Sequence, residues 1–453
     1  MKNGNRKFVW LCVLLLAAFS LFGCPQSETE TVKPPVIDPP VVGPPVEVPS
    51  FALELFEALR GRRVVTGGWA DHANGGRGIA YADPEAPTVI CDCDNPDPIA
   101  KLEAFIAALY PRHRPVFIVI CGDIDLSRGA ITDVPGPVPG ATWDPDNPNS
   151  GAVVNARRLD IRSNDTTIIG INNARIKFGG LRINGNMLSN TMNIIIRNVT
   201  FWDARDTRPN PGLDHLLLTG NGTPNDHGND WPTGVWLDHV KFSSGYTDYR
   251  LGGDWHDTLL NVTLGELTVS RSRFTNANEV LLAGGNDSAL VREQRRITLH
   301  GNYFHDARTR MPRTRGTQMH MYNNYFRSIG IPGPGWSNGY VMGPGRNAHF
   351  IVQNNFFDAP IQGSRVVNWS FNNSGAVVWH SDNAGLPLNP AFLTGGGSPA
   401  PVLTTDPALR PWEPGDFYEY TLAADVEGLR NLIPGSAGPT LETIEDFMAG
   451  LRN

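Results

Sequence analysis

The sequence predicts an all-β chain folded as a parallel β-helix, a solenoid with capping helices at both ends. Between residues 160 and 360 helical periodicity disappears, and a repeat of eight-residue segments replaces it. Each segment has an apolar residue at its first and third positions and Phe at its eighth. The intervals between successive Phe residues are 41, 32, 30, 22 and 31, so constant rungs alternate with variable loops. The segments are Ile194–Phe201, Val235–Phe242, Leu267–Phe274, Ile297–Phe304, Met319–Phe326 and Phe350–Phe357.

Asparagine occupies one equivalent place in the last three of these segments, at Asn302, Asn324 and Asn355. Stacked coils would align these side chains, so that they hydrogen-bond along one turn of the solenoid. A β-sandwich or a propeller is the alternative. A propeller blade needs four strands, and a unit of about 30 residues is too short for that.

Helical patterns flank the repeat. Ser50 precedes an amphipathic stretch that ends at Gly61, and Asp97-Pro98 begins a second stretch that stops before Pro111. A third begins near Thr440. We expect the helices at Ser50 and Thr440 to cap the exposed ends of the solenoid.

The N-terminal fifty residues differ from the rest in composition. Residues 1–23 have a basic start, an apolar body and a small-residue end, which indicates a lipoprotein signal peptide with Cys24 as the lipidated residue. An ordinary signal peptide or a membrane anchor is the alternative, although nine apolar residues are few for a span of about 20. Residues 24–50 are a Pro-rich tether, and residues 51–453 form the β-helix domain. We therefore expect a secreted bacterial lipoprotein on the cell surface or outer membrane.

Charge and cysteine content narrow the function further. The net charge of −7 becomes −10 once residues 1–23 are removed. An acidic protein has little affinity for nucleic acid or for an anionic membrane surface, so we expect no nucleic-acid partner and membrane contact only through the lipid anchor. Cys91, Cys93 and Cys121 remain in the exported domain, and one of the first two could pair with Cys121. Three cysteines without matching histidines are a poor zinc site.

Variable loops of a solenoid gather on one side and build its binding face. The long ones are residues 202–234, 243–266, 275–296 and 305–318. The last contains four arginines within Arg308–Arg315, in a chain that is acidic overall. Composition alone would allow this run to be a solvated or salt-bridged surface.

Ordered motifs resemble the pectate/pectin lyase family, polysaccharide lyase family 1, over roughly residues 61–440. They are Val235–His239, Asp257–Asn261, Leu267–Ser270, His300–Phe304, Arg310–Arg315 and His320–Asn324. The resemblance implies a right-handed parallel β-helix that cleaves α-1,4-linked polygalacturonate, as pectate or partly methylated pectin, by β-elimination with Ca²⁺. We expect a monomer whose partner is this acidic polysaccharide.

The resemblance also implies roles for single residues. Arg310 is the base that removes the C5 proton, and Arg315 binds the substrate carboxylate, with Arg313 beside it. A guanidinium group is normally protonated, but crowding by like charges would favour its neutral form. Asp257, Asn261 and, in the preceding insertion, Asp214 are the calcium ligands, since Ca²⁺ prefers oxygen donors.

Two residues depart from the family pattern. Asn261 stands where the family usually has Asp, and Glu279 stands in the substrate-binding position where pectate lyases usually carry Lys. These departures keep a second hypothesis open, a non-catalytic surface β-helix that binds acidic plant polysaccharide. A glycoside hydrolase is the least favoured of the three hypotheses. Such an enzyme needs two carboxylates on either side of the glycosidic bond, and the rungs show no compact acidic pair.

Overall fold

The computed structural model describes part of the chain, all of it within one compact unit, Val48–Asn453. The signal peptide, the tether, Cys24 and Cys93 lie outside the described residues. None of the described helices combines the length and apolarity needed to span a bilayer. The described ranges are 50–59, 63–64, 66–71, 88–91, 97–109, 116–129, 131, 157–161, 166–184, 192–205, 212–220, 233–245, 256–263, 265–285, 295–329, 339–358, 365–368, 372–386, 388, 400–448 and 451–452.

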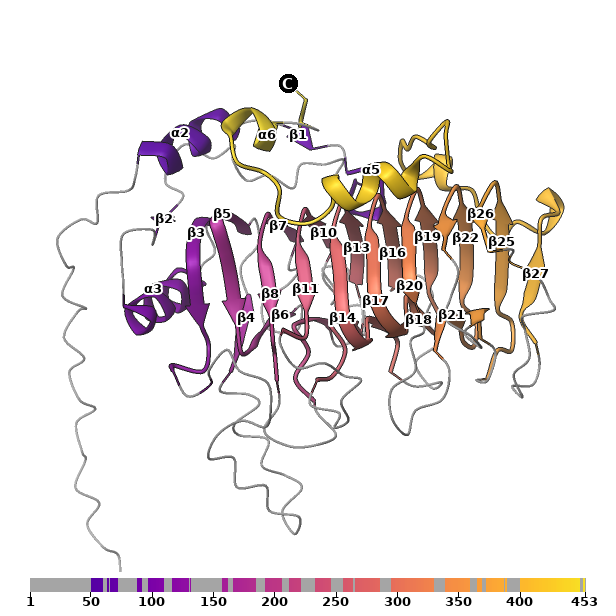
Figure 1. Cartoon of the computed structure of the whole chain (residues 1–453), viewed down its shortest axis with the longest axis horizontal. Coiled ribbons are helices and arrows are strands. Elements are labelled where there is room, and N and C mark those ends of the chain that lie inside the picture. Colours follow the sequence, from indigo (N-terminus) through magenta and orange to yellow (C-terminus); the bar gives the residue numbers. More distant parts are fainter. Residues whose placement is uncertain are drawn as a thin grey trace, which may run out of the picture. The chain divides into compact units, whose positions relative to one another are not determined.

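Parallel strands from successive coils stack into two large sheets, one of 18 strands and one of 8 (Figure 1). The predicted parallel β-helix is therefore confirmed. In the larger sheet the strands are β2 (Thr88–Cys91), β3 (Val116–Asp125), β5 (Thr166–Lys177), β7 (Met192–Arg197), β8 (Thr200–Trp202), β10 (Thr233–Asp238), β11 (Lys241–Ser243), β13 (Gly265–Ser270), β14 (Arg273–Glu279), β16 (Arg295–His300), β17 (Tyr303–Thr309), β19 (Gln318–Tyr322), β20 (Tyr325–Ile329), β22 (His349–Gln353), β23 (Phe356–Phe357), β25 (Val377–Ser381), β26 (Ala384–Gly385) and β27 (Val402–Thr404).

The smaller sheet forms another face of the solenoid, and its strands follow one another in the order of the chain. Its strands are β4 (Arg158–Ile161), β6 (Gly180–Asn184), β9 (Leu216–Thr219), β12 (Leu260–Val262), β15 (Leu281–Ala283), β18 (Arg313–Thr314), β21 (Tyr340–Pro344) and β24 (Arg365–Val367). Four of these strands, β9, β12, β15 and β18, fall inside the insertions that the sequence shows between rungs.

Each predicted eight-residue segment is two strands joined by a corner, not one strand. The fifth residue of every segment has a positive φ, for example 59° at Asn198 and 54° at Asn323. Asn and Gly adopt this left-handed conformation readily, so the chain turns there from one face of the solenoid to the next. His239 and Arg271 take the same corner position with φ of 51° and 45°.

The core contains the two ladders that the repeat predicts. The eighth-position Phe rings stack from Phe201 to Phe357, with neighbouring centroids 4.5–5.2 Å apart. Beside them, the side-chain amide of Asn302 donates to Asn324 at 3.0 Å, and that of Asn324 donates to Asn355 at 2.9 Å. These bonds satisfy buried amides on three successive coils and hold those coils in register.

The helices form at the residues that the sequence predicts, but two of them do not cap the ends of the solenoid as expected. Helix α3 (Pro98–Leu109) adds Leu102 and Phe105 to the main core at the first coils. Helices α2 (Ser50–Leu59) and α6 (Ile444–Met448) pack together against β3, β5, β7 and β10, in a separate apolar cluster (Figure 1). They cover the side of the early coils rather than standing at opposite ends, because their apolar faces match the outward apolar residues of those strands.

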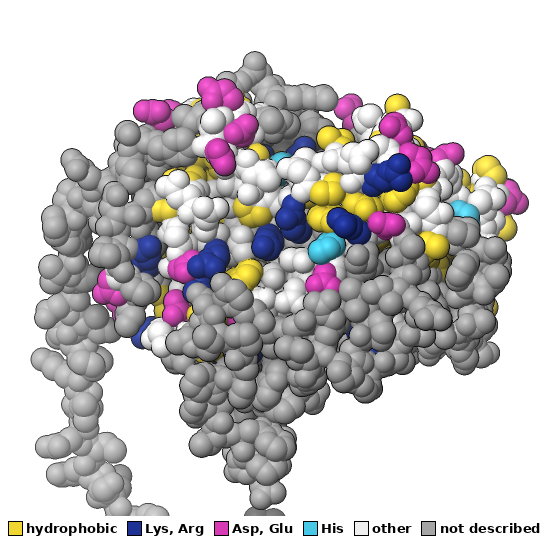
Figure 2. Space-filling view, in the orientation of Figure 1, with side chains coloured by type: hydrophobic (Ala, Val, Ile, Leu, Met, Phe, Trp, Pro, Cys, Tyr) yellow, Lys and Arg dark blue, Asp and Glu magenta, His cyan; other side chains and the backbone are white. Residues whose placement is uncertain are grey.

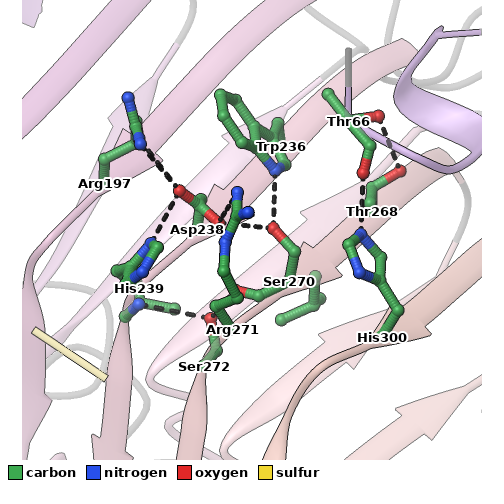
Figure 3. Close-up of polar contacts among 12 residues, drawn as sticks. Thr66, Arg197, Trp236, Asp238, His239, Thr268, Ser270, Arg271, Ser272 and His300 are labelled. Carbon is green, nitrogen blue, oxygen red and sulfur yellow. Dashed lines mark hydrogen bonds and ion pairs between the residues drawn. The ribbon is translucent and has the colours of Figure 1, made fainter. Parts of the chain in front are cut away.

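A buried polar network surrounds Asp238 (Figure 3), and one of its members also bonds to α6. Asp238 accepts from Ser270 at 2.5 Å and pairs with Arg197 and Arg271, while Arg197 also donates to the carbonyl of Phe447 in α6. Burial alone would raise the pKa of Asp238, but Arg271, His239 and Arg197 hold it well below its usual value. Asp238 is thus a structural residue.

Cys121, at the point where β3 bends, is disulfide-bonded. This agrees with the expectation that Cys121 pairs with another cysteine of the exported domain.

Candidate active site

The candidate site lies at the corner where the chain enters the smaller sheet. Pairing of β9, β12 and β15 places Leu216, Leu260 and Leu281 opposite one another on successive coils. The residues two positions earlier are Asp214, Thr258 and Glu279, which therefore stack at one corner. Residues that are 21 to 44 positions apart in sequence become neighbours because the coils repeat in register.

Arg310 approaches this corner from the next coil. One of its terminal nitrogens, Nη2, lies 2.5 Å from Glu279 Oε1, and the other, Nη1, donates to Thr258 Oγ1 at 3.3 Å. The side chains of Arg310 and Glu279 are 18% and 19% exposed, so the pair is mostly removed from water but reachable by a ligand. Arg310 has a φ of 60° and precedes the cis Met311-Pro312 bond. The sequence did not predict the ion pair with Glu279.

Asp214, Asp257 and Asn261 form an oxygen-rich cluster beside Arg310. The amide nitrogen of Asn261 lies 3.3 Å from both carboxylate oxygens of Asp214, and Thr258 bonds to Asp257 at 3.4 Å. Burial and the nearby charge of Asp257 raise the pKa of Asp214 well above its usual range. The sequence showed no compact acidic pair, and the folding of two coils creates one from Asp214 and Asp257.

Arg158 of β4 partly neutralises this cluster, with Nη2 3.8 Å from Asp214 Oδ2. Burial lowers the pKa of Arg158, while Asp214 opposes that shift. Arg158 could not be identified from the sequence, because it lies outside every motif. The stacking of β4 on β6, and of β6 on β9, brings it near Asp214.

Arg313 and Arg315 continue the site on β18 and directly after it. Arg313 shares a register row with Asn261, separated from it by Leu282. Arg315 Nη1 donates to the carbonyl of Gly284 at 2.9 Å. Burial lowers the pKa of Arg313, and the charges of Arg315 and Arg310 act in the same direction. These three arginines therefore interact electrostatically, as the sequence predicted.

Arg308 bonds to a different strand, β14. Its Nη1 donates to the side-chain oxygen of Asn278 at 2.7 Å, and its side chain is buried. Tyr340 of β21, by contrast, is close enough to Arg310 to feel its charge: burial raises the pKa of Tyr340, and the charges of Arg313 and Arg310 oppose that shift. Tyr340 was missed in the sequence because it carries no motif.

The donor set fits a hard divalent cation. Two carboxylates, from Asp214 and Asp257, and the amide of Asn261 converge on one corner, and the repulsion between the acids is what a cation relieves. Among the described residues, no group of three His, Cys, Asp or Glu side chains forms a metal cluster. Two carboxylates and one amide make a lean set, so a Ca²⁺ ion there would need further oxygens from substrate or water.

A family model for pectate lyase matches residues 148–393, a span that contains all of these site residues. The chain belongs to the pectate lyase family. It is 26% identical over 224 residues to a pectate lyase of Bacillus subtilis, which covers 45% of this chain and 49% of that protein. It is 29% identical over 286 residues to pectate lyase A of Dickeya chrysanthemi, which covers 58% of this chain and 65% of that one. The matches thus span about half to two thirds of these relatives.

Solved structures of pectate lyases share the fold. A pectate lyase bound to a hexasaccharide superposes with a TM-score of 0.62 at 20% identity, covering 83% of this chain and 98% of that one. A pectate lyase from Acidovorax avenae superposes with a TM-score of 0.59 at 23% identity, covering 83% and 95%. Pectate lyases are typically secreted and often depend on calcium, so the family agrees with export and with an oxygen-rich site.

Proposed function

We propose that this pectate lyase family member cleaves α-1,4-linked polygalacturonate, as pectate or partly methylated pectin, by β-elimination to 4,5-unsaturated oligogalacturonides. The observation that carries the proposal is the position of Arg310 against Thr258 and Glu279, beside the acidic cluster of Asp214 and Asp257. A candidate base thus lies beside a set of cation ligands, and elimination next to a carboxylate needs both.

In this proposal Arg310 removes the C5 proton of a uronate. Arg313 and Arg315 supply positive charge beside Arg310, and this charge attracts the substrate carboxylates. Arg315 binds one such carboxylate, and its bond to the carbonyl of Gly284 holds the guanidinium in position. A calcium ion held by Asp214, Asp257 and Asn261 would stabilise the charge that develops on the substrate carboxylate.

Glu279 opposes this arrangement in the substrate-free state. Its carboxylate forms an ion pair with the positively charged Arg310 guanidinium and contributes to the negative potential at Asp214. Substrate must displace the pair or bring a cation to it. A substrate with some methyl-esterified carboxyl groups meets less repulsion from Glu279, so partial methylation should be tolerated better than by a lyase with Lys at this position.

The test is formation of the C4=C5 chromophore, followed by ultraviolet absorbance on unmethylated and methylated polymer with and without chelator. We expect absorbance with the intact protein, loss with chelator, and loss in Arg310→Lys. Arg327→Lys, an exposed arginine on β20, is the matched control and should keep full activity. New reducing ends without the chromophore would exclude elimination.

The alternative is a non-catalytic β-helix that binds acidic plant polysaccharide, and the Glu279–Arg310 pair favours it. Retention on immobilised pectin with no turnover at any calcium concentration would support that alternative. We also propose that residues 24–50 tether the domain to a lipid on Cys24. Labelled fatty acid should enter the intact protein and not Cys24→Ala.

A further inference from the structure

A basic hollow lies away from the candidate active site, on the outer face of the first coils. It has a volume of about 740 Å³ and is open to solvent. Figure 2 shows dark-blue basic side chains grouped on the face where strands β3 to β11 run. The lining side chains come from α3, β3, β5, β8 and β11, and they include Lys101, Asp123, Arg175, Trp202 and Lys241.

Lysine use in the chain is concentrated here. After residue 50 the sequence contains only Lys101, Lys177 and Lys241. Lys101 and Lys241 line the hollow, and Lys177 binds Asp123, which also lines it. In a chain with a net charge of −7, all of the lysines of the folded domain thus gather on one surface. Solvated lysines spread over a surface would not show this pattern.

Among the described residues of the lining, the one carboxylate, that of Asp123, is already engaged. Arg175 binds both oxygens of Asp123, at 2.6 and 2.8 Å, and Lys177 lies 3.1 Å from one of them. Lys101 donates to the carbonyl of Cys121, at 3.4 Å. Within the described part of the chain, neither Lys101 nor Lys241 has a carboxylate partner. Two positive charges of the hollow are therefore left for a ligand.

Lys241 lies among like charges. Burial, together with Arg273 and Arg175, lowers its pKa. Register explains the crowding, because Lys241 is paired with Arg273 on the next coil and with Thr200 on the previous one, which is itself paired with Arg175. An anion placed there would relieve a repulsion that the fold imposes.

Trp202 gives the hollow an apolar wall between these cations. Its ring lies 5.3 Å from Lys241 Nζ and 5.8 Å from the guanidinium carbon of Arg175. Asn172 and Asn173 add amides at the corner of β5. Cations, amides and an indole are the groups that recognise a sugar carrying a carboxylate, since the ring packs on the indole and the charge meets the cations.

We propose that this hollow is a second binding site for a carboxylated polysaccharide, separate from the corner that holds Arg310. The choice of polymer rests on the proposed function, which makes polygalacturonate the probe. Two sites on one protein bind a long chain more tightly than either site alone, whereas a short oligomer gains nothing from the second site. The hollow would thus hold the protein on its polymer.

The experiment measures retention in native gels that contain long polygalacturonate, with all variants in an Arg310→Lys background to prevent turnover. Lys241→Gln and Lys101→Gln should each weaken retention roughly 3- to 10-fold, the scale of one partly exposed charge pair. Arg327→Gln removes the same charge from the larger sheet outside the hollow and should leave retention unchanged. Trigalacturonate affinity for the corner that holds Arg310 should be equal in all variants.

Three results would overturn the inference. These are unchanged retention in both lysine variants, an equal loss in Arg327→Gln, or equally strong lysine-dependent retention by dextran sulfate and DNA, which would indicate a general anion patch. Circular dichroism melting of each variant confirms that the fold is kept. Failure of the proposed function would look different. If the protein forms no chromophore but its retention still depends on the two lysines, the lyase activity is excluded and the second binding site is supported.

Discussion

The ion pair between Arg310 and Glu279 gives the most specific prediction. Glu279 is the residue that departs from the family pattern, and Arg310 is the candidate base. For Arg310 to accept a proton it must first be neutral, and the Glu279 carboxylate 2.5 Å away stabilises the charged form. Glu279→Gln removes that stabilisation and keeps the size of the side chain. We therefore expect the variant to eliminate faster than the parent protein.

The size of the effect follows from the exposure of the pair. Fully exposed pairs are worth up to about 1 kcal/mol and disruption of buried ones costs about 3–5 kcal/mol. With both side chains about one-fifth exposed, solvent screening reduces the coupling to about 1–2 kcal/mol. That corresponds to roughly a 5- to 30-fold rise in kcat, at 1.36 kcal/mol per factor of ten.

The assay is initial-rate ultraviolet absorbance on unmethylated polygalacturonate at saturating calcium. Glu413→Gln is the matched control, since Glu413 also pairs with an arginine, Arg410, away from the site. Its rate should equal that of the parent. A lower or unchanged kcat in Glu279→Gln would refute the reasoning, because the carboxylate would then be neutral to catalysis or needed for it.

Three further predictions concern the solenoid. Asn324→Ala removes the acceptor of the buried backbone N–H of Asn302 and breaks the side-chain ladder to Asn302 and Asn355, so it should lower unfolding stability by about 2–4 kcal/mol in denaturant titration. Asp238→Asn removes a carboxylate whose pKa is held low. That carboxylate stabilises the fold above about pH 4, and this stabilisation is lost as the pH falls. The melting temperatures of the parent and the variant should therefore converge in acid. Burial lowers the pKa of His320 from 6.5 to about 3, so its neutral form stabilises the fold above pH 6.5 and this contribution falls as acid protonates the unfolded chain. His320→Gln should therefore melt with a weaker pH dependence between 6.5 and 4, and an unchanged slope would contradict this assignment.

Much of the fold could be read from the sequence because its information is local and repeated. Each coil must bury two apolar residues and one Phe, so the pattern recurs wherever the rung recurs, and the Asn ladder follows from equal positions in successive rungs. The corner inside each segment was missed. Its signal, a residue tolerant of positive φ at the fifth position, is obscured where His239 or Arg271 occupies that place.

The sequence by itself determined the repeat, the ordered motifs and the identity of Arg310, Arg315, Asp214, Asp257 and Asn261 as candidates. Only the tertiary structure decided which charges meet. Stacking of coils brings Glu279 to Arg310 and Arg158 to Asp214, and it gathers the domain's lysines around one hollow. These contacts join residues on different coils, and loops of variable length separate the coils, so no fixed spacing in the sequence encodes them.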